Sequence, residues 1–412
     1  MSHRPHRLIT VILALAGATS AGLVAEENWP RFRGPDGMGN STETALPQKW
    51  DAGAIAWKTE LKGEGQSSVV NWGDKLFVTS ATDGGKTRWV HCLDRKTGAI
   101  LWEKSVACAT PEAAHKMNSW ATATCATDGE RVVAFFGPAG IHCFDMDGKA
   151  LWSREVGSFP GDWGVGASPI IDGDLVYQNC DAEGPSNLIA LNKKTGEPVW
   201  TTARTDSPKG GWSTPILIEA AGRRELVLNG EFGVNAYDPA TGKDLWFCKA
   251  PTGRGEPVPV LAQGNLYVVC GKPGNTYVVK PGGSGDVSAT HRVWEARRQG
   301  GRDLPSPAVV GDYLLVSSMS GILTTYDAGT GAIHFTERLD APASAAPVVA
   351  GGLVYFQMEN GEVIVVKPGK TLEVVARNSL GSADDEIFRA SLAPIQGQWF
   401  SRSQRTVYCI GK

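Results

Sequence analysis

Short apolar runs separated by glycine-bearing turns repeat along the whole chain. The clearest copy spans residues 305 to 337 and reads "PSPAVV", "GD", "YLLVSS", "MSG", "ILTTYD", "AGTG" and "AIHFTE". Four short runs rich in Val, Ile, Leu, Tyr and Thr, separated by Gly-bearing turns, indicate a four-stranded antiparallel meander. We expect meanders at residues 67–106, 121–156, 167–204, 213–250, 257–297, 305–339 and 345–380.

An aromatic residue closes a decapeptide that recurs with each meander, as in "LDRKTGAILW" (93–102), "LNKKTGEPVW" and "YDPATGKDLW". The Asp94 carboxylate can accept backbone N–H bonds in the turn, and Gly98 can take a positive φ without a Cβ penalty. We expect the aromatic side chain to lie on the outermost strand, to fill the wedge between neighbouring sheets and to donate its indole N–H to a carbonyl. The closing aromatics lie 45, 50, 48, 46, 48 and 41 residues apart, at Trp57, Trp102, Trp152, Trp200, Trp246, Trp294 and Phe335.

Four-stranded sheets that recur every 41 to 50 residues either stack as an open solenoid or close radially as a propeller. Residues 390–412 supply three strands and stop where the fourth should begin, whereas residues 54–61, "AIAWKTEL", hold an isolated outer-strand pattern around Trp57. The chain therefore predicts an all-β fold: an eight-bladed β-propeller of four-stranded antiparallel blades, whose last blade is closed by an N-terminal strand. An open solenoid would show capping repeats, and a transmembrane barrel would need strands of about ten residues.

The first residues have the pattern of a secretory signal peptide. Arg4 and Arg7 precede an apolar run, residues 8–18, that is too short to span a membrane, and Ala21 or Ala25 offers a small residue for cleavage. We therefore divide the chain into a signal peptide (1–25), an N-terminal extension (26–53) that either straps the blades or plugs the channel, and a single propeller (54–412). The protein is expected in the periplasm or outside the cell, as a monomer and not as an integral membrane protein.

The charge balance narrows the range of partners. The chain has 40 basic and 43 acidic residues, and removing residues 1–25 takes away two arginines and no acid, which leaves a net charge of −5. This balance gives no reason to propose nucleic acid or an anionic membrane as a partner.

Eight cysteines in an exported chain suggest disulfides, but their positions argue otherwise. Cys92, Cys143 and Cys409 fall at the same point of their repeats, so stacked sheets would hold them about 10 Å apart, beyond the reach of a disulfide. We expect these three to be free and buried. Cys108 and Cys125 flank one long connection and are the pair to test.

The recurring Asp, Thr-Gly, Trp pattern over residues 54–412 resembles the tryptophan-docking repeat of quinoprotein-type propellers. The chain is most similar to the exported PQQ-like repeat proteins of bacteria, several of which begin with a stretch similar to "NWPRFRGPDGMG". That family includes the propeller subunit of the outer-membrane barrel assembly machinery, a scaffold that binds polypeptides. The resemblance implies a fold, and fold similarity by itself assigns no reaction.

The resemblance also raises quinone chemistry. Family enzymes bind pyrroloquinoline quinone (PQQ) beside a Ca²⁺ held by carboxylate and amide oxygens, and the alcohol dehydrogenases place adjacent cysteines over the cofactor. This sequence has no Cys-Cys pair, so we assign no catalytic and no cofactor-binding residue. "DMDG" at 145–148 occupies a turn and lacks the downstream Glu of a Ca²⁺ loop, and His91 and His142 are equivalent repeat positions, so no metal site is expected.

Candidate binding residues lie on the connections from the outer strand of one blade to the inner strand of the next, because functional residues concentrate on loops held by a rigid scaffold. These candidates are aromatic or basic: Trp120, Trp163, Trp212, His115, Arg254 and Arg302, with Arg297 and Arg298 beside the last. An acidic run occupies residues 384–386. Together they predict an aromatic-walled funnel with one basic flank, suited to a peptide segment or an anionic small molecule. The alternative is that the tryptophans pack the blade tops and the charges are merely solvated.

Two functions from different classes follow. The first is an exported, non-catalytic propeller scaffold that binds a protein or small-molecule partner at the funnel face. The alternative is a PQQ-dependent dehydrogenase with an unusual site. A hydrolase is a third class, but the sequence shows no acid and base that can be paired.

Overall fold

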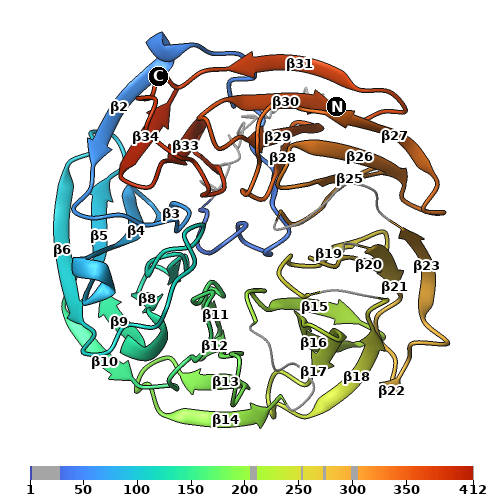
Figure 1. The fold of residues 1–412 in the computed structure, drawn as a ribbon, viewed down its shortest axis with the longest axis horizontal. Helices are drawn as coiled ribbons and strands as arrows, with labels where there is room; N and C mark the ends of the chain where they lie inside the picture. The colour runs from blue at the N-terminus through green and yellow to red at the C-terminus, as the bar shows by residue number, and fades with distance from the viewer. Residues whose placement is uncertain (2–27, 205–210, 252–253, 272–274, 298–304, 412) are drawn as a thin grey trace.

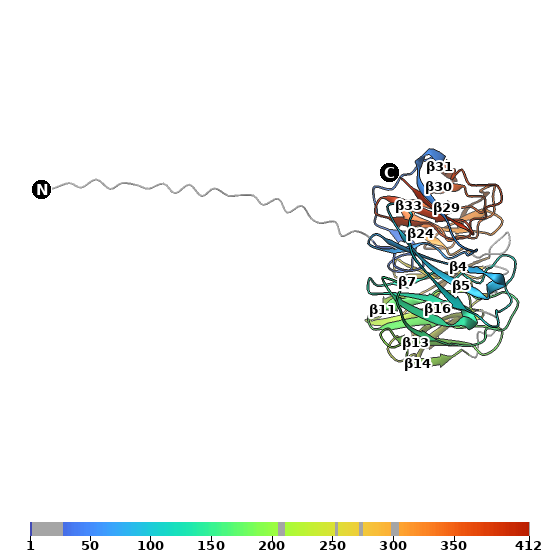
Figure 2. The ribbon, with the colours of Figure 1, turned by 90° about the vertical axis from the view of Figure 1, so that its left-hand side faces the viewer.

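The computed structural model describes Met1 and residues 28–204, 211–251, 254–271, 275–297 and 305–411. These residues form eight sheets arranged around a central channel (Figure 1). Figure 2 shows the ring from the side. The predicted all-β class and the eight-bladed propeller are confirmed. Among the described residues, no helix is long and apolar enough to cross a bilayer.

Each blade is an antiparallel meander that starts at the channel and ends at the rim. The strands of the first four blades, from inside to outside, are β3 (Val70–Trp72), β4 (Lys75–Thr82), β5 (Thr87–Asp94) and β6 (Ile100–Ala107); β7 (Ala126–Thr127), β8 (Arg131–Phe135), β9 (Ile141–Asp145) and β10 (Ala150–Arg154); β11 (Ile170–Asp172), β12 (Leu175–Asn179), β13 (Asn187–Asn192) and β14 (Pro198–Ala203); and β15 (Ile216–Ala220), β16 (Arg223–Asn229), β17 (Gly233–Tyr237) and β18 (Asp244–Lys249).

The other four blades follow the same order. Their strands are β19 (Val260–Ala262), β20 (Asn265–Val269), β21 (Asn275–Val279) and β23 (Arg292–Arg297); β24 (Ala308–Val310), β25 (Tyr313–Ser317), β26 (Ile322–Asp327) and β27 (Ile333–Arg338); β28 (Val348–Ala350), β29 (Leu353–Gln357), β30 (Val363–Lys367) and β31 (Glu373–Asn378); and β32 (Ala393–Ile395), β33 (Gln398–Arg402), β34 (Thr406–Ile410) and β2 (Ile55–Glu60). Two short strands, β1 (Asn40–Ser41) and β22 (Gly285–Asp286), extend blades 7 and 4. Three 3-10 turns complete the regular structure: η1 (Ala52–Ala54), η2 (Asp83–Gly85) and η3 (Gly137–Ala139).

The two ends of the chain close the ring in blade 8. Strand β2 pairs antiparallel with β34, with Trp57 opposite Cys409, so an N-terminal strand supplies the outer edge of the last blade. This arrangement confirms the closure predicted from the incomplete repeats at the two ends.

The recurring decapeptide forms the turn between the two outer strands of a blade. The Asp94 carboxylate accepts hydrogen bonds from the backbone N–H groups of Lys96 and Thr97 at 3.1 and 2.8 Å. Gly98 has a φ of 72°, and a Cβ at this position would lie 2.5 Å from the Trp57 ring of the preceding blade. Glycine is therefore needed twice, for the backbone conformation and for the close approach of the indole.

The same docking joins five blade junctions. In each, an outer-strand indole N–H donates to a carbonyl of the next blade's turn at 2.8–3.1 Å, and the ring lies on that turn's glycine. The donor and acceptor pairs are Trp57 and Arg95, Trp102 and Met146, Trp152 and Lys193, Trp200 and Pro239, and Trp294 and Ala328. The glycines are Gly98, Gly148, Gly196, Gly242 and Gly331.

Trp246 differs from the other docking tryptophans. Its indole N–H donates to the Glu225 carboxylate of its own blade at 2.8 Å, and its side chain is fully buried. In blade 5 the connection between β21 and β23 is a long turn, residues 280–291. It folds back here, and its strand β22 pairs in parallel with β18 at Trp246 and Phe247. The insertion thus takes the place that a plain turn occupies at the other junctions.

A ring of hydroxyl groups joins the blades at the channel wall. At six junctions the backbone N–H of a residue just before an inner strand donates to a Ser or Thr hydroxyl of a neighbouring blade, at 2.9–3.0 Å. The donor and acceptor pairs are Ser68 and Thr124, Thr124 and Ser168, Ser168 and Thr214, Val258 and Ser306, Ala346 and Ser391, and Ser391 and Ser68. At the other two junctions the equivalent acceptor position is Val258 or Ala346, neither of which has a hydroxyl.

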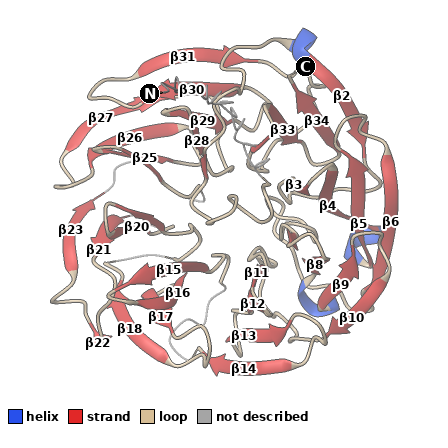
Figure 3. Ribbon diagram, turned by 180° about the vertical axis from the view of Figure 1, so that it is seen from behind, coloured by secondary structure: helices blue, strands red, loops and turns tan. Residues whose placement is uncertain are grey.

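The first half of the N-terminal extension plugs one end of the channel, and Figure 1 shows it as a blue loop across the centre of the ring. It is held by blades on opposite sides. Trp29 is buried; its backbone N–H donates to the side-chain amide oxygen of Asn71 in blade 1 at 2.6 Å, and its carbonyl accepts the Asn71 backbone N–H at 3.0 Å. The Met38 sulfur accepts the backbone N–H of Leu261 in blade 5 at 3.3 Å. Strand β1 then pairs in parallel with β28. Figure 3 shows the same crossing from behind.

Arg33 anchors this plug without a carboxylate contact in the described chain. Its guanidinium is buried and donates to backbone carbonyls, including those of Gly37 at 3.2 Å and Pro307 at 3.1 Å. Burial lowers the pKa of Arg33 to about 10, so the group is still charged at neutral pH. The second half of the extension runs over blades 7 and 8. There the Trp399 indole donates to the Pro47 carbonyl, and the backbone N–H of Trp50 donates to the side-chain oxygen of Asn378. The structure therefore combines the two placements left open by the sequence.

All eight cysteines are buried and lie outside any disulfide. The prediction for Cys92, Cys143 and Cys409 is thus confirmed, and burial raises the pKa of each of these thiols to about 12. Cys108 and Cys125, the pair selected for testing, are also free.

We expect Trp57→Ala to lower the free energy of unfolding by about 2–4 kcal/mol, because it removes the indole that joins blade 8 to blade 1 and leaves the Arg95 carbonyl without its donor. Urea denaturation measures the change. Leu101→Ala is the control, since that side chain is 48% exposed on the rim. Equal stability of the Trp57 variant and the wild type would contradict non-covalent closure at this junction.

The hydroxyl ring predicts a stabilising substitution. Ala346→Ser should raise the free energy of unfolding by about 1 kcal/mol, because it supplies the acceptor that Ser391 provides at the next junction. The reverse change, Ser391→Ala, should lower it by about 1–3 kcal/mol by leaving the Ala346 N–H unpaired. Thermal and urea unfolding test both variants. A loss of stability in Ala346→Ser would show that the ring's gap is set by packing and not by a missing acceptor.

Candidate functional site

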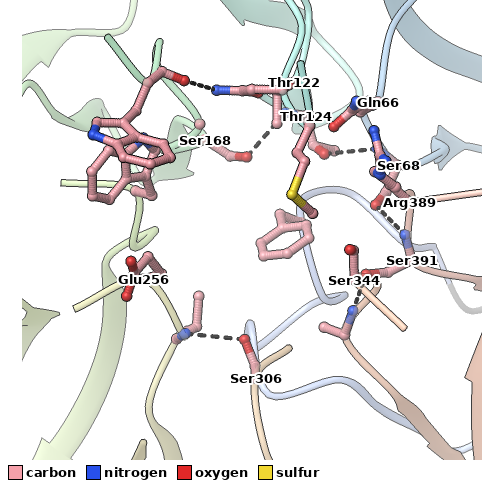
Figure 4. A pocket seen from close by; sticks show the side chains of 18 of the residues that line it. Gln66, Ser68, Thr122, Thr124, Ser168, Glu256, Ser306, Ser344, Arg389 and Ser391 are labelled. Atoms are coloured by element: carbon pink, nitrogen blue, oxygen red, sulfur yellow. Dashed lines mark hydrogen bonds between the residues drawn. The ribbon is translucent and has the colours of Figure 1, made fainter. Parts of the chain in front are cut away.

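A cavity of about 190 Å³ occupies the channel above the plug. Phe32 of the plug is part of its lining, and the starts of the inner strands form its wall. Figure 4 shows hydroxyl and amide side chains from different blades arranged around the hollow. The plug residues lie against the side of the ring that carries the turns between first and second strands, so the cavity opens on the side that carries the connections between blades.

Five wall hydroxyls have a shared property. Each accepts a backbone N–H in the hydroxyl ring, and within the described residues none donates its own proton to a protein group. They are Ser68, Thr124, Ser168, Ser306 and Ser391. The cavity wall therefore offers several O–H donors to a ligand.

Aromatic and basic side chains gather at one side of the mouth. The ring centroids of His115 and Trp163 lie 4.7 Å apart. The guanidinium carbon of Arg254 lies 5.1 Å from the centroid of Trp163 and 5.9 Å from that of Trp212. Such distances fit cation–π contacts, which hold the Arg254 side chain against the two indoles.

Hydrogen bonds fix the loops that carry these rings. The Asn118 amide donates to the backbone carbonyls of Trp163 and Val165 at 2.8 and 3.1 Å, and the Trp212 indole donates to the Gly164 carbonyl at 2.9 Å. Three consecutive inter-blade connections are therefore tied together. These hydrogen bonds between the connections hold the aromatic wall in shape.

The charged groups at the cavity differ in their partners. Arg389 pairs with Glu359 at 3.3 Å, and Glu359 also accepts the Ser344 hydroxyl. Arg254 has no carboxylate partner among the described residues, and Glu256 also lies in the lining. The cavity thus combines one arginine that is available to an anion with one carboxylate nearby.

The structure brings together four of the six candidate residues: His115, Trp163, Trp212 and Arg254 all line the cavity. Trp120 lies elsewhere, where its indole donates to the Glu112 carbonyl at 2.9 Å and its ring packs on Gly85. It therefore packs a blade top, as the structural alternative proposed.

Two further sequence features fall outside the cavity lining. Arg302 and Arg298 lie outside the described residues, and Arg297 is exposed at the end of β23. In the acidic run, Asp385 pairs with Arg405 at 2.6 Å, and Glu386 is buried against Ser403 and Tyr408. This run is a structural contact of blade 8 and not a flank of the mouth.

Sequence reasoning missed the wall. The missing signal was a Ser or Thr two residues before six of the eight inner strands, in several cases followed by Pro, as in "GASPII" and "LPSPAVV". It also missed Arg389, Met117 and Met319, which line the cavity. No local pattern marks these residues, since only the closed ring brings their blades together.

A hydrogen-bonded Ser, His and Glu occur side by side on blade 1. The His91 Nε2 lies 2.7 Å from the Ser80 hydroxyl, and Nδ1 lies 2.9 Å from the Glu103 carboxylate. These are the residue types of a hydrolase triad, but the Ser80 and His91 side chains are fully buried. A nucleophile must reach its substrate, so this trio supports the fold and not a reaction.

A sequence profile of the family described as "Outer membrane protein assembly factor BamB" matches residues 86–279 and 230–375, more than half of the chain. The chain belongs to this family. The resemblance to PQQ-like propellers related to the barrel assembly subunit is thereby confirmed.

Individual relatives include both dehydrogenases and an assembly factor. The polyvinylalcohol dehydrogenase of Pseudomonas sp is 25% identical over 341 residues, 66% of this chain and 50% of that protein. The outer membrane protein assembly factor BamB of Burkholderia pseudomallei is 23% identical over 350 residues, 73% of this chain and 84% of that protein. The chain spans only half the length of the dehydrogenase.

Solved structures show the same division. BamB from Moraxella catarrhalis has 16% identity and a TM-score of 0.63, covering 87% of this chain and 97% of that one. Quinohemoprotein alcohol dehydrogenase from Comamonas testosteroni has 12% identity and a TM-score of 0.70, covering 93% and 81%. These likenesses establish the fold alone.

The described lining does not fit a calcium-bound quinone. Ca²⁺ takes about six to eight oxygen ligands, several of them carboxylates, whereas Glu256 is the single carboxylate among the described lining residues. Nor do the residues that the structure describes include any cluster of three or more His, Cys, Asp or Glu side chains placed to hold a metal. We derive no reaction step through this cofactor.

We expect the buried His91 to contribute to the loss of folding stability at low pH. Burial, opposed by Glu103, lowers the pKa of His91 to about 4, below the value near 6.5 expected in the unfolded chain. The unfolded state therefore binds a proton first, so the stability contributed by neutral His91 is complete above pH 6.5 and is lost as the pH falls to 4. The loss is up to about 3 kcal/mol, at roughly 1.4 kcal/mol per pKa unit.

We expect the unfolding free energy of His91→Gln to fall less steeply than that of the wild type between pH 6.5 and 4, because glutamine does not titrate. Urea denaturation at a series of pH values measures this slope. His334→Gln, on the outer strand β27, is the matched control and should keep the wild-type slope. Parallel curves for His91→Gln and the wild type would exclude the effect.

Proposed function

We propose that this protein is an exported, non-catalytic propeller that binds a partner at its funnel face, in the cavity walled by Trp163, Trp212 and Arg254. The observation that carries the proposal is the arginine held on two indole faces at an open mouth, without a carboxylate partner among the described residues. Aromatic side chains and arginine dominate the binding energy of protein surfaces when they lie in such pockets.

The rest of the ring supports a binding role for this face. The opposite end of the channel is crossed by the plug, so a partner has access from one side. BamB proteins, which are named as outer membrane protein assembly factors, are among the relatives that align with this chain over most of the length of both proteins. A periplasmic or secreted location follows from the signal-peptide pattern, and a protein or a small molecule both suit the mouth.

A PQQ-dependent dehydrogenase is the second candidate, favoured by the relatives that carry this activity in their names. Its flat, anionic cofactor would suit Arg254 and the indoles, but the described donors do not suit its calcium. Titrating the purified protein with PQQ and Ca²⁺ separates the two functions. The binding propeller predicts no oxidation of alcohols or sugars in the presence of an artificial electron acceptor, and turnover would refute it.

Site-specific photo-crosslinking tests where the partner binds. We expect a photoreactive residue at Met117, in the cavity lining, to give a defined adduct in cells that make the protein, because a bound partner covers the mouth. The same residue at Leu101, exposed on the rim, is the control. Adducts from the rim without any from the mouth would place the partner elsewhere and overturn the proposal.

A further inference from the structure

We propose that the cavity recognises a single carboxylated sugar ring, that is, a hexuronate, either free or at the end of a polysaccharide. This inference rests on the proposed binding function and adds the chemical class of the ligand. It combines three independent features of the site: an arginine without a carboxylate partner among the described residues, the hydroxyl donors of the wall, and the size of the cavity.

Arg254 supplies the carboxylate contact. A guanidinium presents parallel N–H donors that match the two oxygens of a carboxylate, and the two indoles hold this group in place before a ligand arrives. The other arginine of the described lining, Arg389, is already paired with Glu359, so Arg254 alone faces the ligand and suits a single negative charge better than the double charge of a phosphate.

The indole faces and the wall hydroxyls suit the two faces of a sugar. A pyranose has apolar C–H patches that pack on Trp163 or Trp212, and its hydroxyl and ring oxygens accept hydrogen bonds from the wall. Five wall hydroxyls retain a proton to donate, and the Gln66 amide lies beside them. A flat aromatic acid would leave these donors desolvated without acceptors, which is costly.

The volume of the cavity limits the enclosed part of the ligand to one ring. At about 190 Å³ the cavity is smaller than the roughly 300–1,000 Å³ of pockets that enclose drug-sized ligands. A tripeptide or a three-ring system would extend beyond it. The open mouth allows the next unit of a chain to leave toward solvent, so a terminal residue fits as well as a free sugar.

Isothermal titration calorimetry on the purified protein tests the proposal. D-glucuronate and D-galacturonate are the probes, with D-glucose and D-galactose as neutral partners and benzoate as the acid without hydroxyls. We expect at least one uronate to bind, with an affinity at least tenfold above that of its neutral sugar and above that of benzoate. Equal binding of benzoate, or no uronate binding, would overturn the inference.

Variants separate the contributions of the contacts. Arg254→Gln should remove the tenfold preference for the acid over its neutral sugar while keeping the melting temperature. Trp212→Ala should weaken both sugars, and the acid at least as much as the neutral sugar, because it removes a stacking face and one of the two indoles that hold Arg254. Arg297→Gln, an exposed arginine outside the lining, is the matched control and should bind as the wild type. An undiminished acid preference in Arg254→Gln would also overturn the inference.

The same assay distinguishes the two sources of the sugar. Tighter binding of trigalacturonate than of galacturonate supports recognition of a chain end, and equal affinities support the free monosaccharide. If no uronate binds while the crosslinks at Met117 persist, the ligand inference fails and the binding function stands. If the crosslinks are also absent, both fail.

Discussion

The structure depends on covering both faces of every blade. A four-stranded sheet with two apolar faces is unstable alone, so each blade must lie against two others, and only a closed ring provides this for all eight. The contact that recurs between blades and helps to cover these faces is the packing of an outer-strand indole on the turn glycine of the next blade. Closure at β2 and β34 is the same contact, made between the two ends of the chain.

Closure also decides the chemistry of the channel. Inner strands begin at the channel wall, where their first backbone N–H groups have no neighbouring strand to pair with and would be costly to leave unsatisfied. The Ser and Thr ring accepts these N–H groups across the junctions, and each hydroxyl keeps its own proton. The groups that join the blades are therefore also O–H donors of the cavity wall, so in the binding function proposed here stability and ligand recognition would share atoms at Thr124 and Ser168.

A contact could be predicted from the sequence where its partners lie close together along the chain, and could not where they lie far apart. Asp94 and Gly98 act within one turn, so their roles are readable from the decapeptide, and the period fixes the blade number. Trp246 and Trp120 have the same local appearance as other tryptophans, but the Trp246 indole donates to Glu225 of its own blade beside strand β22 of the next blade, and the Trp120 indole donates to Glu112. The plug carries no strand pattern, because Arg33 bonds to carbonyls that only the closed ring assembles.

The division between wall and mouth implies where specificity can change. A wall hydroxyl cannot be replaced without exposing a backbone N–H at a junction, although Val258 and Ala346 show that a ring with six of eight bonds still closes. The guanidinium of the mouth residue Arg254 has no carboxylate partner among the described residues and lies against the Trp163 and Trp212 rings, while its backbone carbonyl accepts the Gly271 N–H. Related propellers can therefore keep one wall and differ in ligand by exchanging residues on the inter-blade connections.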